Sequence, residues 1–309
     1  MLDQYIDNLI KNIPTREKPY ELDLVLEGGI FNGSYETGIL LFLKELEKKN
    51  YLIINRISGC SVGSIGALKY FMNTVENSCL EWEKFRYQFR ENFNLDVLRE
   101  IIEKDVHSLD DETFSKIKKD KLYINYYDAQ TKEQVVVSEF ETRNDILDAI
   151  LKSCHIPYLT NGRCYVEEED NQYLDGGFPH IFPERYPSYS HQHILYVSIS
   201  HFSKLKNMLR TRNETTIHGR ALEGVIDVYN FFLREKSTLM CSFVDQWSLL
   251  DFTILRVKQG AILFSIYWLA LCRKIGKSIH PYAERISLYH QLIPVWREMW
   301  RDMILHICF

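Results

Sequence analysis

The sequence predicts an α/β fold with a mostly parallel central sheet, because two strand–helix pairs follow one another near its start. Residues 22–26 form an apolar run typical of a buried strand, and residues 34–48 repeat apolar side chains at helical spacing. Residues 52–57 are a second run rich in β-branched side chains, and residues 64–72 again show helical spacing. A helix between two such strands returns the chain to the same end of the sheet, so the strands run parallel and the connection is right-handed.

The turn between the second strand and its helix carries a motif of defined chemistry. It has the pattern G-x-S-x-G, with Gly59 and Gly63 flanking Ser61. At a strand–helix junction this pattern is a nucleophile elbow, in which a tight turn presents the serine hydroxyl at the start of a helix. The glycines are required because a Cβ atom there would crowd the turn. We therefore expect Ser61 to be a nucleophile.

A second glycine-rich turn follows the first strand, with Gly28, Gly29 and Gly33 between that strand and its helix. Main-chain amides in such a loop can point at an anion. The glycines do not fit the G-x-G-x-x-G spacing of dinucleotide-binding loops, and no G-K-[ST] follows them. An oxyanion hole beside Ser61 is the better interpretation of these amides.

A third glycine turn, Asp175-Gly176-Gly177, follows two short apolar segments at 163–166 and 172–174 that we predict to be strands. An Asp–Gly pair alone is most often a simple turn. A nucleophilic serine needs a base, however, and an aspartate between small residues can approach it closely. In combination with the elbow, the pattern predicts Asp175 as that base.

These three motifs together resemble the patatin-like phospholipase family. The segments that carry the resemblance are residues 24–40, 56–68 and 147–177, in the order that the family has them. The last includes Ser153-Cys154-His155-Ile156-Pro157, where the family has small residues ending in Ile-Pro. The resemblance implies a three-layer α/β/α fold and a lipid acyl hydrolase of phospholipase A type. It implies a Ser61–Asp175 dyad, with an oxyanion hole formed by the amides of Gly28, Gly29 and Ile30.

The glycine loop departs from the family pattern at two positions. Ile30 stands where the family usually has a third glycine, and Asn32 stands where it usually has arginine or lysine. An isoleucine can still donate its amide if the required backbone conformation is not restricted to glycine. The missing cation weakens the positive field near the loop. An alternative is therefore a catalytically impaired relative that acts as a lipid- or partner-binding module.

Two other nucleophile arrangements compete with the dyad. An α/β-hydrolase triad also uses G-x-S-x-G, but its acid is followed by a histidine and its elbow comes later in the chain. Several histidines follow Asp175, whereas His155 and His180 near it fit local hydrogen bonding better. Cys60 is a conceivable nucleophile, but we expect its side chain to point away from the tip of the elbow and to serve packing.

The rest of the chain fits one catalytic domain over residues 21–200, after an amphipathic helix and linker at 1–20. We expect a helical extension over residues 201–309 that packs on the same domain. Residues 76–120 are charged and helical in pattern, and they could form a lid over an acyl pocket. Further expected elements are an aromatic helix stripe at Trp82, Phe85, Phe89 and Phe93, strands at 122–127, 135–140 and 194–199, and a helix at 144–154.

Composition narrows the partners and the setting. The 309 residues carry a net charge of −5 and no basic stripe with interleaved aromatics, which argues against a nucleic-acid partner. Seven cysteines without zinc-like spacing indicate reduced thiols and a cytosolic setting. The dyad needs no cofactor and no metal. The expected substrate is a lipid ester.

Membrane contact is an open alternative at both ends of the chain. Apolar side chains at helical spacing form an N-terminal stripe of Leu2, Tyr5, Ile6, Leu9, Ile10 and Ile13. A second stripe consists of Trp296, Trp300, Met303 and Ile304, with Arg297 and Arg301 between them. Each could lie in a lipid interface, although packing on the protein's own core is the commoner role. The apolar run at 261–272 falls short of the ~20 residues of a membrane span, so we expect a buried core helix there.

Overall fold

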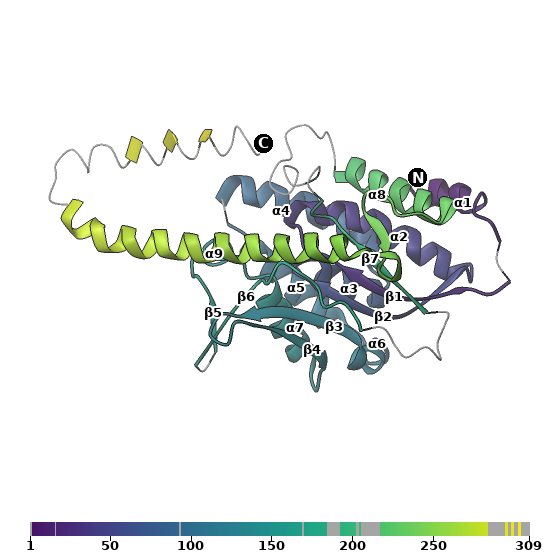
Figure 1. Ribbon diagram of the computed structural model, residues 1–309, viewed down its shortest axis with the longest axis horizontal. Coiled ribbons are helices and arrows are strands. Elements are labelled where there is room, and N and C mark those ends of the chain that lie inside the picture. The colour runs from purple at the N-terminus through teal and green to yellow at the C-terminus, as the bar shows by residue number, and fades with distance from the viewer. Residues whose placement is uncertain are drawn as a thin grey trace.

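The computed structural model describes residues 2–283 apart from 16, 93, 169, 184–191, 202–203 and 205–216, together with 294–295, 298–299 and 302–303. A central sheet has helices on both sides, so the predicted α/β class is confirmed (Figure 1). The helices are α1 (Leu2–Ile10), α2 (Gly33–Lys48), α3 (Val62–Met72), α4 (Ser78–Asn92), α5 (Val97–Ser108), α6 (Asp111–Ile117), α7 (Arg143–Ser153), α8 (Ile217–Arg234) and α9 (Leu249–Ala283).

The eight-stranded sheet has the order β5-β6-β3-β2-β1-β7-β8, and β4 pairs with β3 beside this path. Its strands are β1 (Tyr20–Leu26), β2 (Leu52–Cys60), β3 (Lys119–Asp128), β4 (Glu133–Glu139), β5 (Val166–Glu168), β6 (Asn171–Leu174), β7 (Gln192–Val197) and β8 (Cys241–Phe243). The four central strands β3, β2, β1 and β7 pair in parallel, and the outer pairs are antiparallel. The sheet is thus mostly parallel at its centre, where the carboxyl ends of β1 and β2 lie side by side.

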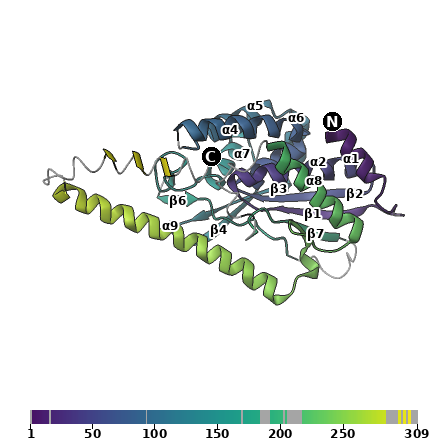
Figure 2. The same cartoon turned by 90° about the horizontal axis from the view of Figure 1, so that it is seen from above.

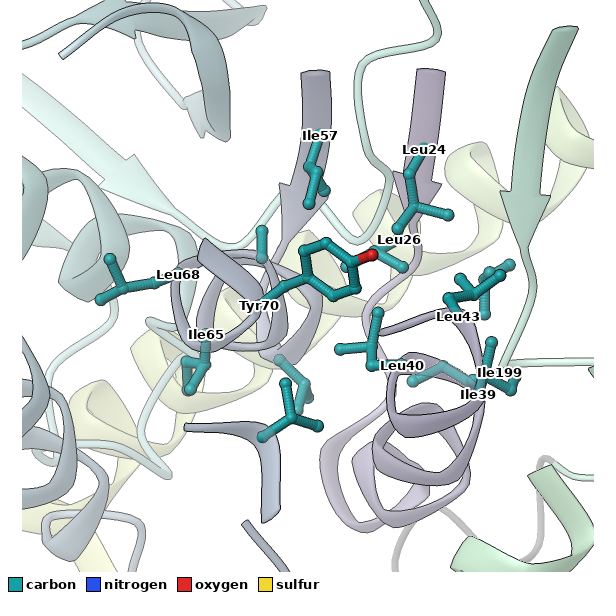
Figure 3. Close-up of a cluster of buried hydrophobic side chains, with 14 of the residues drawn as sticks. Leu24, Leu26, Ile39, Leu40, Leu43, Ile57, Ile65, Leu68, Tyr70 and Ile199 are labelled. Atoms are coloured by element: carbon teal, nitrogen blue, oxygen red, sulfur yellow. The ribbon is translucent and has the colours of Figure 1, made fainter. Parts of the chain in front are cut away.

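The two faces of the sheet are covered differently. Alternate side chains of β1 point to opposite faces, so Leu24 and Leu26 enter the large core, whereas Val25 joins a smaller cluster with Phe182 and Tyr196. Helices α2, α4 and α5 lie on one side of the sheet, and α9 runs along the other (Figure 2). The close-up shows β1 and β2 meeting α2 and α3 through Leu24, Leu26, Ile39, Leu40, Leu43, Ile57, Ile65, Leu68, Tyr70 and Ile199 (Figure 3).

Most expected elements occur, with boundaries shifted by a few residues. The first of the two short strands before Asp175 was expected at 163–166 but lies at Val166–Glu168, because pairing with β6 begins only at Val166. In α4, the stripe residues Trp82, Phe85 and Phe89 are buried as core, and Phe93 lies outside the described residues.

The amphipathic stripe of α1 packs on the protein itself. Ile6 and Ile10 are buried, as is Ile13 just after the helix, and they belong to the large core. Leu2 and Leu9 are partly buried against the same cluster, which leaves Tyr5 as the exposed member of the stripe. Core packing, the commoner of the two roles expected for this stripe, is the one that the structure has.

The prediction of a buried core helix at 261–272 is wrong. These residues lie within α9, which is 35 residues long and keeps most of its apolar side chains exposed. Phe264 is 68% exposed and Trp268 is 56% exposed, while Ile266 on the inner side is buried. The pattern alone could not distinguish a helix inside the core from one that touches the domain with a single face.

The residues after 200 add more than helices to the domain. Helix α8 packs along α2, and β8 extends the sheet by pairing antiparallel with β7. The division at residues 20 and 200 stays a prediction. Of the second expected membrane stripe, Trp296, Trp300 and Ile304 lie outside the described residues, as do Arg297 and Arg301.

Candidate active site

Ser61 occupies a sharp turn between β2 and α3. Strand β2 ends at Cys60 and α3 begins at Val62, so this serine alone joins the two elements. Its φ of 54° and ψ of −127° lie outside the regions that L-residues favour. Such strain is characteristic of a residue whose position is fixed by its surroundings for a function. The local geometry is that of a nucleophile elbow.

Main-chain contacts explain why glycines flank this serine. A Cβ atom on Gly59 would lie 2.3 Å from the carbonyl oxygen of Gly63. A Cβ atom on Gly63 would lie 2.5 Å from the carbonyl oxygen of Leu26 in β1. Backbone atoms of a packed strand and helix cannot move aside, so the turn closes only with glycine at both positions.

The elbow is held from behind by α7 and β3. The Ser61 amide donates to Ser153 Oγ at 2.8 Å, and Ser153 Oγ in turn donates to the Asn125 carbonyl oxygen at 2.7 Å. Asn125 also donates through Nδ2 to the Gly59 carbonyl oxygen at 3.0 Å. Sequence reasoning assigned no role to Ser153 or Asn125. The sequence signal that could have indicated a role for Ser153 is its place as a small residue just before Cys154, in the run that ends in Ile-Pro.

Asp175 follows β6 and is fixed by hydrogen bonds on both sides. Its amide donates to the His155 carbonyl oxygen at 3.0 Å, and its Oδ1 accepts from the Gly177 amide at 2.8 Å. Burial is the largest influence on the carboxyl and raises its pKa above the ordinary value. The neighbouring Ser61 side chain, the Gly177 amide and the Cys60 side chain act in the opposite direction and lower this pKa. The structure thus brings the hydroxyl of Ser61 and the carboxylate of Asp175 together.

The expected orientation of Cys60 is wrong. Its Sγ lies 3.4 Å from Oδ1 of Asp175, although we expected the side chain to point away from the elbow. As the last residue of β2, it faces the loop that leaves β6. Burial and the nearby carboxylate raise the pKa of this thiol well above its usual range, so it stays protonated and donates to Asp175. A protonated buried thiol is a poor nucleophile.

The glycine loop after β1 lies directly against the serine. A Cβ atom on Gly28 would lie 2.8 Å from Ser61 Cβ and 3.5 Å from its Oγ. None of the described residues accepts a hydrogen bond from the amides of Gly28, Gly29 or Ile30. Three adjacent donors beside a serine hydroxyl are what an oxyanion hole requires.

Ile30 adopts a conformation that disfavours its side-chain type. Its φ is 46°, in the left-handed region where a β-branched residue is a marked outlier. L-residues can adopt this region at an energetic cost. Isoleucine at this position can therefore still present its main-chain amide in the loop. The 3₁₀ turn that follows (Ile30–Asn32) then leads directly into α2.

A buried arginine from α8 reaches the glycine loop at Asn32, the position where a basic residue was expected from the resemblance. Asn32 is buried, and its Nδ2 donates to the Ile199 carbonyl oxygen at 2.7 Å. Arg220 is only 1% exposed and donates to the Phe31 carbonyl oxygen at 3.1 Å and to Asn32 Oδ1 at 3.4 Å. Its guanidinium also lies 5.5 Å from the centre of the Tyr35 ring. The loop therefore has a cation beside it that no local motif could reveal.

An apolar pocket lies next to the elbow and the start of α2. Its free volume is about 30 Å³, and its wall includes Val62 and Gly33. Helices α4 and α5 cover it with Trp82, Phe85, Leu98 and Ile101. Glu36 also lines it, and burial raises the pKa of this carboxyl well above its usual range, which favours its neutral form. The residues expected to cover an acyl pocket thus border an apolar space that reaches Val62, the residue after Ser61.

The described histidines do not form a triad with the serine. His155 meets Asp175 only through its carbonyl oxygen, and burial lowers the pKa of its ring. His180 stacks on Tyr123 with ring centres 6.1 Å apart. His193 lies at the amino end of β7 and contacts Asp245, away from the carboxyl ends of the strands. Within the described ranges, no three His, Cys, Asp or Glu residues are grouped as metal ligands.

The fold and this site define a class of α/β proteins with a serine at a nucleophile elbow. Comparison with known proteins gives the family: the patatin-like phospholipase model matches residues 24–186. The chain belongs to the patatin-like phospholipase family, whose members act on lipid esters. It is 24% identical over 162 residues to patatin-like phospholipase domain-containing protein 4 of Homo sapiens. This match covers 50% of the chain and 63% of the human protein.

Proposed function

We propose that this protein is a lipid acyl hydrolase of phospholipase A type that cleaves carboxylic esters of membrane lipids. Ser61 is the nucleophile and Asp175 is its base. The contact between these two side chains, beside the unpaired amides of the glycine loop, is the observation that carries the proposal.

The first half-reaction acylates the serine. Asp175 takes the hydroxyl proton while Ser61 Oγ attacks the ester carbonyl carbon. The tetrahedral intermediate carries its negative charge on the former carbonyl oxygen, which accepts hydrogen bonds from the amides of Gly28, Gly29 and Ile30. The Val62 amide and the dipole of α3 are smaller aids. The intermediate then collapses, and Asp175 returns the proton to the departing alcohol.

The second half-reaction releases the acid. Asp175 removes a proton from water as the water oxygen attacks the acyl carbon, and the ester bond to Ser61 breaks. The serine regains its proton and the fatty acid leaves. The raised pKa of Asp175 suits this role, because a carboxylate with the ordinary pKa of about 3.9 is a weak base at neutral pH.

The apolar pocket beside Val62 is our candidate site for the acyl chain. Its apolar wall and its position between the elbow and α4 suit a hydrocarbon chain whose carbonyl lies at Ser61. The free volume of about 30 Å³ is close to that of one water molecule, so α4 has to move away for a chain to enter, as a lid over residues 76–120 would.

A lipid hydrolysis screen tests the proposal. Wild type and Ser61→Ala are incubated with vesicles of phospholipid, lysophospholipid or acylglycerol, and the released fatty acid is measured. Ser265→Ala, which changes an exposed hydroxyl on α9, is the control. We expect release by wild type and the control and none by Ser61→Ala. A folded wild type that binds lipid without releasing fatty acid would contradict the proposal and support a binding module instead.

A further inference from the structure

Helix α9 has an apolar stripe along its outer face. The stripe, here called the outer stripe, follows alternating steps of four and three residues through Leu250, Ile254, Val257, Ala261, Phe264, Trp268, Leu271 and Ile275. Val257 is 66% exposed and Leu271 is 48% exposed. So large a row of exposed apolar side chains indicates an interaction surface.

We propose that the outer stripe docks α9 on a lipid surface with anionic headgroups and holds the active site there. The proposal rests on the proposed lipid hydrolase function, because it supplies the surface from which the substrate comes.

The contacts of α9 place it along a surface rather than across one. Its segment Leu249–Gly276 is long and apolar enough to cross a membrane by length and composition. Its inner side, however, is attached to the domain along much of this length. Lys258 pairs with Glu27 at 3.1 Å, Ile266 packs with Leu174, and the Arg273 guanidinium lies 4.1 Å from the centre of the Tyr158 ring. A helix with protein on one side and apolar side chains on the other suits the plane of an interface.

The charges beside the outer stripe favour an anionic surface. Over Leu249–Gly276 the basic residues are Arg256, Lys258, Arg273 and Lys274, against a single acid, Asp251. Arg256 and Lys274 are exposed and lie on the same edge of the stripe, 18 residues or five helical turns apart. The helix is thus cationic within a chain whose net charge is −5. Each basic residue near an anionic leaflet favours binding.

The same charges argue against a second copy of the chain as the partner. The spacing of the outer stripe would suit a coiled coil, but such pairing is stabilised by opposite charges beside the apolar seam. Here the flanking edge carries Arg256 and Lys274 and no acid, so two copies would bring like charges together. Phe264 and Trp268 in the stripe, with Tyr267 beside it, are side chains that membrane interfaces favour.

Helix α9 is joined to both halves of the candidate active site. Lys258 binds Glu27, which immediately precedes Gly28 of the oxyanion loop. Ile262 packs on the Asp175 turn, since a Cβ atom on Gly177 would lie 3.0 Å from its Cδ1. The Tyr267 side chain neighbours Tyr127 of β3 and contributes, after burial, to raising the pKa of that phenol to about 12. Helix α9 runs along one side of the sheet (Figures 1 and 2). Docking of the outer stripe would therefore hold the glycine loop and the Asp175 turn, which contact this helix, close to the lipid surface.

Vesicle flotation of the full chain tests the proposal. The catalytically silent Ser61→Ala chain is mixed with vesicles of phosphatidylcholine alone or with added phosphatidylserine. The test variant adds Phe264→Ser and Trp268→Ser, and the matched control adds Leu80→Ser and Tyr87→Ser, which are 68% and 66% exposed on α4. We expect flotation with phosphatidylserine vesicles, at least a tenfold lower bound fraction for the test variant, and no change for the control.

Two further measurements separate the outcomes. Arg256→Gln with Lys274→Gln should remove the preference for phosphatidylserine, and the Phe264→Ser, Trp268→Ser pair on wild type should leave hydrolysis of a soluble short-chain ester unchanged. Equal flotation of the test variant and its control would overturn the proposal. The proposal would also be overturned if sedimentation equilibrium showed a dimer that does not bind vesicles, and if the test variant were a monomer. Because flotation uses an inactive serine variant, failure of the hydrolase proposal would not affect it.

Discussion

The two loops that meet at the candidate active site are held in different ways. Each contains a non-glycine residue with a positive φ, Ser61 in the elbow and Ile30 in the glycine loop. The elbow is held mainly by local contacts. Gly59 and Gly63 pack so closely against backbone atoms that no Cβ fits, and Ser153 Oγ accepts a hydrogen bond from the Ser61 amide. The glycine loop depends on residues far along the chain, because Arg220 and the Ile199 carbonyl fix its last turn.

One site thus combines a turn encoded locally with a loop encoded across the chain. A locally encoded turn leaves a motif in the sequence. A loop held from a distance tolerates substitutions such as Asn32 for a cation, provided that another element supplies what was lost.

The largest effect is expected at Gly63. Gly63→Ala places a Cβ atom 2.5 Å from the Leu26 carbonyl oxygen, where neither β1 nor α3 can yield. We expect a loss of roughly 4 kcal/mol or more in the free energy of unfolding, measured by urea denaturation. Gly219→Ala in α8 meets no atom within 4 Å and is the matched control, with a change of about 1 kcal/mol or less. A Gly63→Ala protein as stable as this control would refute the local account.

Removal of Arg220 tests the long-range support of the glycine loop. Arg220→Met keeps the length of the side chain but removes the charged donor from the buried Phe31 carbonyl, which keeps the Ser34 hydroxyl as a neutral donor. We expect a loss of about 2–3 kcal/mol in stability. Fatty-acid release should fall about tenfold, because the oxyanion donors shift. Arg234→Met, at an exposed position of the same helix, should change neither. Normal turnover in Arg220→Met would show that the loop does not need its distant cation.

Ser153 tests the support of the elbow from behind. Ser153→Ala leaves the buried amide of Ser61 without its acceptor at 2.8 Å. The expected loss of stability is about 1–2 kcal/mol. We expect kcat to fall about tenfold with KM little changed, since the serine shifts relative to the bound ester. Steady-state kinetics of Ser153→Ala, measured in parallel with the control variant Ser265→Ala, would check this expectation. A change confined to KM would argue against a positioning role.

The smallest effect is expected at Ile30. Ile30→Gly keeps the main-chain donor and relieves a φ of 46° at a β-branched residue. The relief is offset by the entropy of glycine in the unfolded chain, so the net change should stay within about 1 kcal/mol. Turnover should be unchanged or higher. Ile53→Gly, in β2 and without a positive φ, should instead destabilise the protein. Equal losses in both variants would show that the conformation of Ile30 carries no strain.

The same contrast explains what the sequence alone could predict. The central strands, the elbow and the Asp175 turn were predictable because glycine spacing and apolar periodicity are local properties. Arg220, Ser153 and Asn125 were not, because their roles arise only when α8, α7 and β3 pack beside the loops. The orientation of Cys60 was missed because a pattern does not show which side of a strand the neighbouring loop passes.

The two amphipathic helices near the ends of the described chain show another limit of sequence patterns. The apolar stripe of α1 is covered by the core, whereas the outer stripe of α9 faces away from the domain. Periodicity predicts that a helix has an apolar face but not what covers that face. For 261–272 this led to the wrong prediction of a core helix.

The most direct test of the central claim is the pH dependence of serine labelling with a fluorophosphonate in wild type and in Asp175→Asn. Because only the carboxylate can take the proton, labelling of wild type should rise with pH through the pKa of Asp175. That midpoint should lie above the ordinary value of about 3.9, since burial raises this pKa. We expect Asp175→Asn to react at least about a hundredfold more slowly and without this rise. Labelling of Asp175→Asn at the wild-type rate and with the wild-type profile would contradict the account.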